Sequence, residues 1–501
     1  MRRSRSVSFS VLSTLFLVCL ATSAARAQFT YGSFLEPPEG KILQGMGQWD
    51  ADNAAYLSAL AGYGSPPYPG HEMAIVNIPP SESSAGGNRP FDATAAAIML
   101  GNLEDMDEDG RIPAVAISFY DYTAGGGTPT SHDDEVAAET NADMVSQINR
   151  LGDVLEDFGK PVFVRIGLEI NNVTLTGYAE GYHAYDFPIC YQITHDLLID
   201  AGATRCAFVW CWEASAPTDY LDVHPTTGDP KWYPGDEYVD WFGLDIFNRN
   251  EFTELSSPIT AAGSKLSNVL AFIAKADEHQ KPIFIAESSC VDFPIAESAT
   301  DDNDSWDEWF VHYFDFIENN PGIKAIDYIS HDWTGGSGGP DNWLDGNLYN
   351  CDEVMDNWVD AISEPEFLGA DSQLLLNGYT GWWGLNFGKN GAGGLPLLSG
   401  TGTVLPSASV SVSLSGAMAS KPAVLFVGAS AIYASFKGGT LVPNPDVSVF
   451  LTTNGSGGHT YSFTWPSMAT PGTTFYFQYW IKEQNSPEFW AASNAIKGVT
   501  L

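Results

Sequence analysis

Short apolar runs alternate with longer amphipathic stretches over the first two-thirds of the chain. The runs are rich in β-branched and aromatic residues, which is typical of buried strands. We expect strands at 41–48, 73–78, 112–120, 162–169, 206–212, 239–247, 283–287 and 323–330. Apolar positions recur at helical spacing in 141–158, 183–201, 259–279, 306–319 and 352–362. Eight strands, most followed by a helix, predict an α/β fold of the (β/α)₈ TIM-barrel type.

A doubly wound open sheet is the alternative to a barrel, but no Gly-rich phosphate loop follows any of the strands. Alternation within the fourth strand places Arg165 and Glu169 on the face that would point into the barrel. The same rule places Asp245 of the sixth strand inward. Polar groups therefore gather at the carboxyl ends of the strands, where barrel enzymes build their sites.

The pattern changes after Asp371. Short alternating runs at 407–414, 423–427, 447–452 and 474–481 are separated by Gly-rich turns, which predicts an all-β sandwich. Of the 62 acidic residues, only three lie in 372–501, together with five lysines, which gives that part a net charge of +2. Residues 28–371 carry a net charge of −46. We therefore expect a barrel over 28–370 and a sandwich accessory domain over 371–501.

The first 27 residues read as a signal peptide. Arg2, Arg3 and Arg5 precede a short apolar stretch, and Ala25-Arg26-Ala27 offers a cleavage site. The stretch is too short to span a bilayer, so we expect secretion without membrane insertion. The net charge of −40 would repel nucleic acids, anionic membranes and polyanionic glycans. A neutral ligand and a monomeric chain are expected.

Five cysteines follow the predicted signal peptide, so an oxidising compartment would leave at least one thiol unpaired. We expect a Cys290–Cys351 disulfide. Cysteine spacings fit no zinc template, and no metal or cofactor is expected at the site. Asp105, Asp107 and Asp109 resemble the start of a calcium loop. Ala116 stands where an EF-hand needs an acid, so only a looser calcium site stays open.

Two segments end on a glutamate in matching frames. Both open with Lys-Pro, continue through an apolar run and finish at Glu169 and at Glu287. A carboxylate that is buried without a partner costs several kcal/mol, so each requires a reason. Either one alone could close a strand or form an ion pair. Strands four and seven, however, lie across the barrel mouth, where two carboxylates can flank one glycosidic bond as acid and nucleophile. Arg165 would lie beneath Glu169, whereas Glu287 has no such cation in its frame.

The chain resembles the clan A glycoside hydrolases, most closely the family 26 type that includes β-mannanases. The resemblance rests on the R-x-x-x-E pattern ending at Glu169, the stretch 233–247 and the segment Lys281-Pro282 to Glu287. It covers about 41–367. It implies a retaining mechanism with Glu169 as acid/base and Glu287 as nucleophile. Leu168 replaces the usual His of the family 26 mannanases, and Phe247 replaces the usual Tyr of the clan.

Sugar-binding candidates lie near the strand ends. Indole rings pack well on the C–H faces of pyranoses, and Trp333 matches by position an aromatic that clan members place beneath the sugar. The remaining candidates are Arg165, Asn172, Trp212, Asp245 and His331. We expect a secreted hydrolase of a neutral polysaccharide, of the endo-β-1,4-mannanase type. β-Glucan and β-1,3-xylan are alternative substrates, and a catalytically silent glycan-binding barrel is the alternative function.

Overall fold

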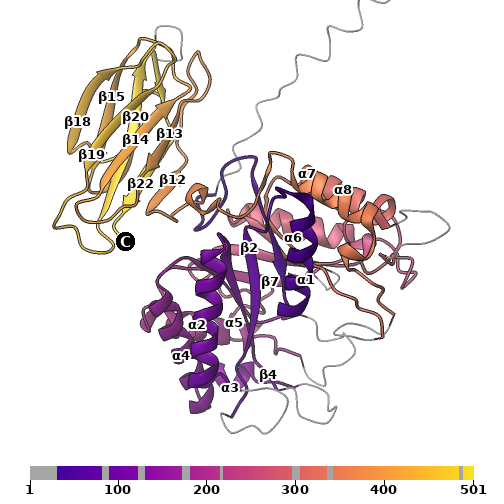
Figure 1. The fold of residues 1–501 in the computed structure, drawn as a ribbon. Helices are drawn as coiled ribbons and strands as arrows, with labels where there is room; N and C mark the ends of the chain where they lie inside the picture. The colour runs from indigo at the N-terminus through magenta and orange to yellow at the C-terminus, as the bar shows by residue number, and fades with distance from the viewer. Residues whose placement is uncertain are drawn as a thin grey trace, which may run out of the picture.

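A computed structural model describes residues 31–81, 90–121, 130–171, 181–214, 218–295, 305–335, 342–483 and 489–501. The predicted signal peptide and Asn172 lie outside these residues. Eight parallel strands close into a barrel through the pairing of the last strand with the first. The strands are β1 (Ile42–Gly47), β2 (His71–Asn77), β3 (Ile112–Ser118), β6 (Val162–Ile166), β7 (Cys206–Glu213), β8 (Trp241–Ile246), β9 (Ile283–Ser288) and β10 (Ile323–Ile329). The predicted TIM barrel is confirmed (Figure 1).

Helices cover the outside of the barrel (Figure 1). They are α1 (Asp50–Leu60), α2 (Ala93–Glu108), α3 (Asp133–Ala137), α4 (Ala142–Phe158), α5 (Phe187–Asp200), α6 (Leu266–Glu278), α7 (Val311–Asn319) and α8 (Asp352–Ile362). The starts of α2 and α4 follow from capping: Asp92 and Asn141 each accept two backbone N–H bonds from the first turn. No helix among the described residues is long and apolar enough to span a bilayer.

The amino-terminal end of the barrel, where the strands begin, is closed by the segment that precedes β1. Phe34 and Leu35 are buried against inward-facing residues of the strands. Trp241 Nε1 donates to the Phe34 carbonyl at 2.7 Å. The Glu36 carboxyl group accepts backbone N–H bonds from Tyr31, Gly32 and Ser33, which satisfies a buried polar group. This end is therefore a packed floor, which leaves the carboxyl ends of the strands as the face available for a site.

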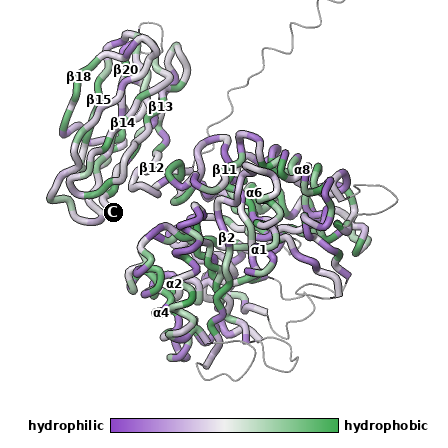
Figure 2. The backbone as a smooth tube through the Cα atoms, viewed as in Figure 1, coloured by the Kyte–Doolittle hydropathy of each residue, from purple (hydrophilic) through white to green (hydrophobic). Residues whose placement is uncertain are grey.

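The C-terminal part consists of antiparallel sheets. A six-stranded sheet holds β12 (Trp382–Leu385), β15 (Pro422–Gly428), β18 (Val447–Thr452), β20 (Thr474–Lys482), β21 (Trp490–Ala492) and β22 (Ala495–Val499). A three-stranded sheet holds β13 (Leu397–Thr401), β14 (Ser409–Ser415) and β19 (His459–Thr464), and β16 (Ala431–Phe436) pairs with β17 (Gly439–Pro443). Buried and more exposed positions alternate along β14, and Figure 2 shows hydrophobic and hydrophilic stretches interspersed through these sheets.

The two larger sheets share one core, which includes Trp382, Val412, Leu425 and Trp465. The predicted all-β architecture after the barrel is therefore confirmed. The boundary near residue 370 stays a prediction, with the last strand paired to the barrel, β11 (Phe367–Leu368), before it and β12 after it.

Two expectations are wrong, and the segment that resembled a calcium loop lies partly in a helix. None of the five described cysteines forms a disulfide, and Cys290 Sγ donates to the Phe293 carbonyl instead of bonding to Cys351. Residues 259–265 precede α6 rather than belonging to it. Asp105 and Asp107 belong to helix α2 rather than to a loop, where Asp107 pairs with Lys160.

Candidate active site at the carboxyl ends of the barrel strands

A β-bulge aims Glu287 into the barrel. Along β9, Phe284 and Ala286 pack in the inner core, so strict alternation would turn the next residue outward. Leu244 pairs with Ile285, but the following residue, Asp245, pairs with Glu287, so Ala286 is an extra residue in the ladder. An extra residue restarts the alternation. Glu287 therefore points inward and is only 6% exposed.

Arg165 bridges two carboxylates inside the barrel. Its Nη1 lies 2.5 Å from Oε1 of Glu287, and its Nη2 lies 2.6 Å from Oδ2 of Asp245. All three side chains are buried. The sequence placed this guanidinium beneath Glu169 and left Glu287 without a cation; in the structure Glu287 does bond this guanidinium. Charge-assisted bonds of this length fix the orientation of both carboxylates.

Glu169 completes a cluster of three carboxylates. One oxygen from each of Glu169, Asp245 and Glu287 lies within 4.8 Å of the other two. Strand β6 ends at Ile166, earlier than expected, and Gly167 and Glu169 both have positive φ values, of 83° and 42°. A positive φ at a non-glycine residue is strained and is frequent at functional sites. This turn brings Glu169 over the strand ends, where it is partly exposed.

The two glutamates therefore occupy different environments. Glu287 is buried on a guanidinium, whereas Glu169 reaches solvent. Burial raises the pKa of Asp245 well above its ordinary value; Arg165 opposes this rise, and the charges of Glu287 and Glu169 add to it. The guanidinium of Arg165 supplies a positive charge to the cluster of carboxylates. The arrangement suits a buried nucleophile beside a more accessible proton donor.

Aromatic rings line one side of the strand ends. Trp333 stands 5.3 Å from Trp49 and 5.0 Å from Trp343, measured between ring centroids, and Trp343 lies 4.7 Å from Phe247. Trp333 is almost fully buried and donates from Nε1 to Ser289 Oγ at 2.9 Å. Trp49 and Trp343 are partly exposed. Trp343, which was missing from the sequence prediction, therefore offers more accessible ring surface than Trp333.

His331 also joins this aromatic group. Its ring lies 4.3 Å from Trp49, and its Nδ1 lies 2.7 Å from Oδ2 of Asp52. The carboxylate of Asp52 thus orients the imidazole beside Trp49 and Trp333. The structure brings His331, Trp333, Asp245 and Arg165 to the same end of the barrel.

Trp212 does not join them. It is 2% exposed and packs in the outer core against Tyr220 and Trp232. Its neighbour Cys211 faces inward and donates to Asp245 Oδ1 at 3.3 Å. Because side chains alternate, Trp212 must face the helix layer. This placement argues against the predicted sugar contact and corrects it.

Glu213 is the carboxylate that the sequence analysis missed. It shares the inward parity of Cys211 and is 7% exposed. Asn171 clamps its backbone, accepting from the Glu213 N–H at 2.8 Å and donating to its carbonyl at 3.1 Å. Burial raises the pKa of nearby Glu251 to about 8, and the charge of Glu213 contributes to that rise. Glu213 ends strand β7 and has the parity of the inward-facing residues, so its position could have identified it from the sequence.

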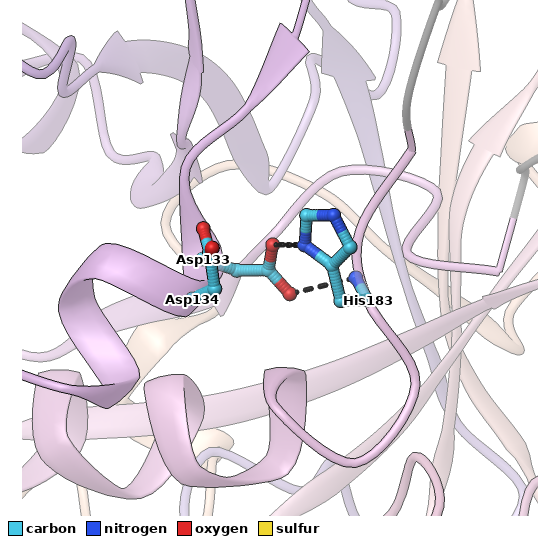
Figure 3. Close-up of side chains that lie close together, drawn as sticks. All are labelled: Asp133, Asp134 and His183. Atoms are coloured by element: carbon cyan, nitrogen blue, oxygen red, sulfur yellow. Dashed lines mark hydrogen bonds and ion pairs between the residues drawn. The ribbon is translucent and has the colours of Figure 1, made fainter.

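A second acidic cluster contains Asp133, Asp134 and His183 (Figure 3). Asp133 accepts from the backbone N–H of His183 at 2.8 Å, and the imidazole Nδ1 lies 2.7 Å from its other oxygen. The hydrogen bond to Asp133 raises the pKa of His183 to about 9, so the ring is protonated at neutral pH. A metal ion would therefore have to displace this proton from His183. The pair is therefore an ion pair that ties the start of α3 to residue 183.

Known proteins resemble this chain over part of its length. No protein-family model matches it. It is 26% identical over 331 residues to the β-1,3-xylanase TXYA of a Vibrio species, covering 61% of this chain and 66% of that protein. It is 25% identical over 255 residues to a β-1,3-xylanase of an Alcaligenes species, covering 47% and 49%. The match thus spans between about half and about two-thirds of these relatives.

Solved structures with a similar chain course include two mannanases. One is an endo-β-1,4-mannanase double mutant from Cellulomonas fimi, with a TM-score of 0.45, 13% identity and coverage of 92% of this chain and 95% of that chain. The other is a β-mannanase from Bacteroides ovatus, with a TM-score of 0.44, 17% identity and coverage of 66% and 91%. The predicted resemblance to glycoside hydrolases is confirmed by the sequence relatives.

Proposed function

We propose that the chain is a retaining glycoside hydrolase in which Glu287 is the nucleophile and Glu169 the acid/base. The observation that carries this proposal is the close approach of the two carboxylates, whose oxygens lie within 4.8 Å. Retaining enzymes hold the two carboxyl groups roughly 5–5.5 Å apart, whereas inverting enzymes need about 6.5–9.5 Å to admit a water. The short separation supports direct attack by one carboxylate.

The two steps assign one role to each group. Glu287, ionised and oriented by Arg165, attacks the anomeric carbon while Glu169 donates its proton to the departing glycosidic oxygen. The leaving sugar departs and a covalent glycosyl ester remains on Glu287. Glu169, now a carboxylate, takes a proton from water, which attacks the anomeric carbon and releases Glu287. Trp333, Trp343 and Trp49 would flank the sugar.

We propose β-1,3-xylan as the substrate and β-mannan as the second candidate. The sequence resemblance favoured β-mannan, but both curated sequence relatives carry the name β-1,3-xylanase. The net charge of −40 favours a neutral chain over a polyanionic one. Secretion through residues 1–27 belongs to the same proposal, because a polysaccharide substrate lies outside the cell.

The test is reducing-sugar release from β-1,3-xylan, β-mannan and mixed-linkage β-glucan by the full chain and by Glu287→Gln. The substitution preserves the shape of the side chain, and we expect activity to fall by at least about 10³-fold. Glu278→Gln is the matched control, because Glu278 is exposed on α6 and pairs with Lys275; it should retain wild-type rates. Equal release by the wild type and Glu287→Gln would refute the nucleophile assignment.

Two further measurements separate the mechanism from its alternatives. The anomeric configuration of the first product, read by proton NMR, should match that of the substrate; the opposite configuration would indicate inversion. Glu287→Ala leaves space for an external anion, so azide should restore turnover and yield a glycosyl azide. Binding of all three polysaccharides without any hydrolysis would instead support a silent glycan-binding barrel.

A further inference from the structure

Two fully buried polar side chains of the barrel strands lie outside the carboxylate cluster. His71 extends from β2 and Asp327 from β10, and neither is exposed. The imidazole Nε2 lies 2.8 Å from the Ile326 carbonyl. Since a carbonyl only accepts, Nε2 carries the proton and Nδ1 of the neutral ring is an acceptor. Nδ1 faces Oδ2 of Asp327 at 3.9 Å.

The side-chain atoms that face each other across this pair lack hydrogen-bond partners among the described residues. Within the described part of the chain, His71 Nδ1 and both carboxyl oxygens of Asp327 make no hydrogen bond. Leaving such atoms unsatisfied in a buried site costs about 1–3 kcal/mol each, more for a charge. A separation of 3.9 Å is too long for a direct bond but suits a bridging water, or a small approach of the two side chains.

Two glycines of the barrel wall leave space for the side chains of His71 and Asp327. Both are inward-facing glycines of β1 and lie against this pair. A Cβ on Gly45 would come within 2.1 Å of the His71 ring, and a Cβ on Gly47 within 3.0 Å of Asp327 Oδ2. Phe284 packs edge-on against the imidazole at 4.9 Å. Any larger residue at either glycine would displace the polar groups, so the space is specific to them.

The charges around Asp327 disfavour its ionisation. Burial raises the pKa of Asp327 well above its ordinary value; the charge of Glu287 on β9 raises it further, Arg165 on β6 lowers it and Glu72 on β2 raises it. Burial also lowers the pKa of His71 to about 4. The neighbouring β1 contributes only Gly45 and Gly47 on this side. A neutral acid facing a neutral ring is the consistent state.

We propose that Asp327 is a protonated carboxylic acid that donates toward Nδ1 of His71, directly or through one water, and so leaves Arg165 to Glu287 and Asp245. A third ionised carboxylate would compete for the single guanidinium and disfavour the ionised form of Glu287. Asp327 touches neither the sugar nor the reacting atoms; the proposal assigns to it a neutral state near Arg165 and Glu287. Its protonation is independent of the proposed hydrolase function; its effect on catalysis rests on that function.

Infrared difference spectroscopy tests the protonation directly. At pH 7, the wild type minus Asp327→Asn should show a carboxylic-acid carbonyl band that shifts when aspartate is labelled with ¹³C. The wild type minus Asp109→Asn, a matched exposed aspartate paired with Arg111, should show only carboxylate bands. A carboxylate band from Asp327 would overturn the proposal. If Asp327→Asn fails to fold, the fallback is His71→Gln, which keeps Asp327 and is labelled with ¹³C-aspartate in the same way. This variant should shift the carboxylic-acid band, and an unmoved band would overturn the proposed donation.

The pH profile tests the consequence for catalysis. Asparagine mimics the neutral acid, so Asp327→Asn should keep kcat/KM within about threefold and leave the acid limb of the profile unmoved. If Asp327 were ionised, its removal would shift the acid limb down by about half a pH unit or more, which would overturn the proposal. A wild type without hydrolytic activity would refute the proposed function alone, because the infrared band would still report the proton.

Discussion

Replacing Arg165 by methionine should destabilise the barrel severely. The guanidinium is 2% exposed and bonds two buried carboxylates at 2.5 and 2.6 Å. Removing one partner of a buried ion pair costs about 3–5 kcal/mol, because a charge is left uncompensated. Here Asp245 and Glu287 would both lose their cation. Domains of ordinary stability unfold with about 5–15 kcal/mol, so we expect a loss of at least about 4 kcal/mol at pH 8.

The loss should shrink in acid, and the sign follows from Asp245. In the variant, Asp245 loses the group that opposes the rise of its pKa, so its folded-state pKa lies still further above its unfolded value. A carboxyl group of this kind destabilises the fold at pH values above its unfolded pKa, and the penalty disappears as protonation proceeds. Arg165→Met should therefore recover part of its stability between pH 8 and pH 5. Asp245→Asn in the same background should restore part of it at pH 8.

The assay is a urea titration of the full chain, with hydrogen exchange of peptides from β6 and β8 to assign the loss to the barrel. Lys160→Met is the matched control, because Lys160 forms an ion pair with Asp107 while half exposed. Exposed pairs contribute about 0–1 kcal/mol, so the control should be nearly silent. A loss below about 1 kcal/mol for Arg165→Met, or an equal loss at pH 5 and pH 8, would contradict the argument.

Two further predictions concern a closely packed glycine and the free cysteines. Gly45→Ala should cost at least about 3 kcal/mol, since its Cβ would overlap the His71 ring. Gly101→Ala, with open space around it in α2, should be neutral or stabilise by up to about 1 kcal/mol in the same urea titration. Dithiothreitol should leave the melting temperature unchanged, because no described cysteine is oxidised; a clear fall on reduction would restore the Cys290–Cys351 bridge.

Much of the fold follows from hydrophobic alternation. The expected strands at 112–120 and 283–287 begin where β3 and β9 begin, and the helix expected at 352–362 matches α8. The ends of the strands are harder to predict from the sequence, because they depend on tertiary contacts. Gly167 ends β6 early with a positive φ, and a Cβ there would meet Phe187 at 2.8 Å. That close packing is a property of the folded chain and leaves no local sequence pattern.

The candidate site also contains positions that alternation predicts and a contact that it does not. Alternation alone places Arg165 and Asp245 inward, and applied to β7 it also places Glu213 inward and Trp212 toward the helices. The sequence therefore predicts these inward and outward positions. The bond from Arg165 to Glu287 cannot be predicted in this way, because the guanidinium reaches across the barrel to a residue on another strand. A pairing between residues 122 positions apart depends on barrel closure.

Glu287 shows most clearly where alternation fails. With Phe284 and Ala286 facing the barrel interior, alternation assigns Glu287 to the helix layer, where an unpaired carboxylate would be costly. The chain resolves this conflict by inserting Ala286 as the unpaired residue of a bulge. Ala286 packs in the inner core together with Phe284. The matching Lys-Pro frames point to two glutamates whose oxygens lie within 4.8 Å of each other, but only the bulge explains how the second of them can meet the first.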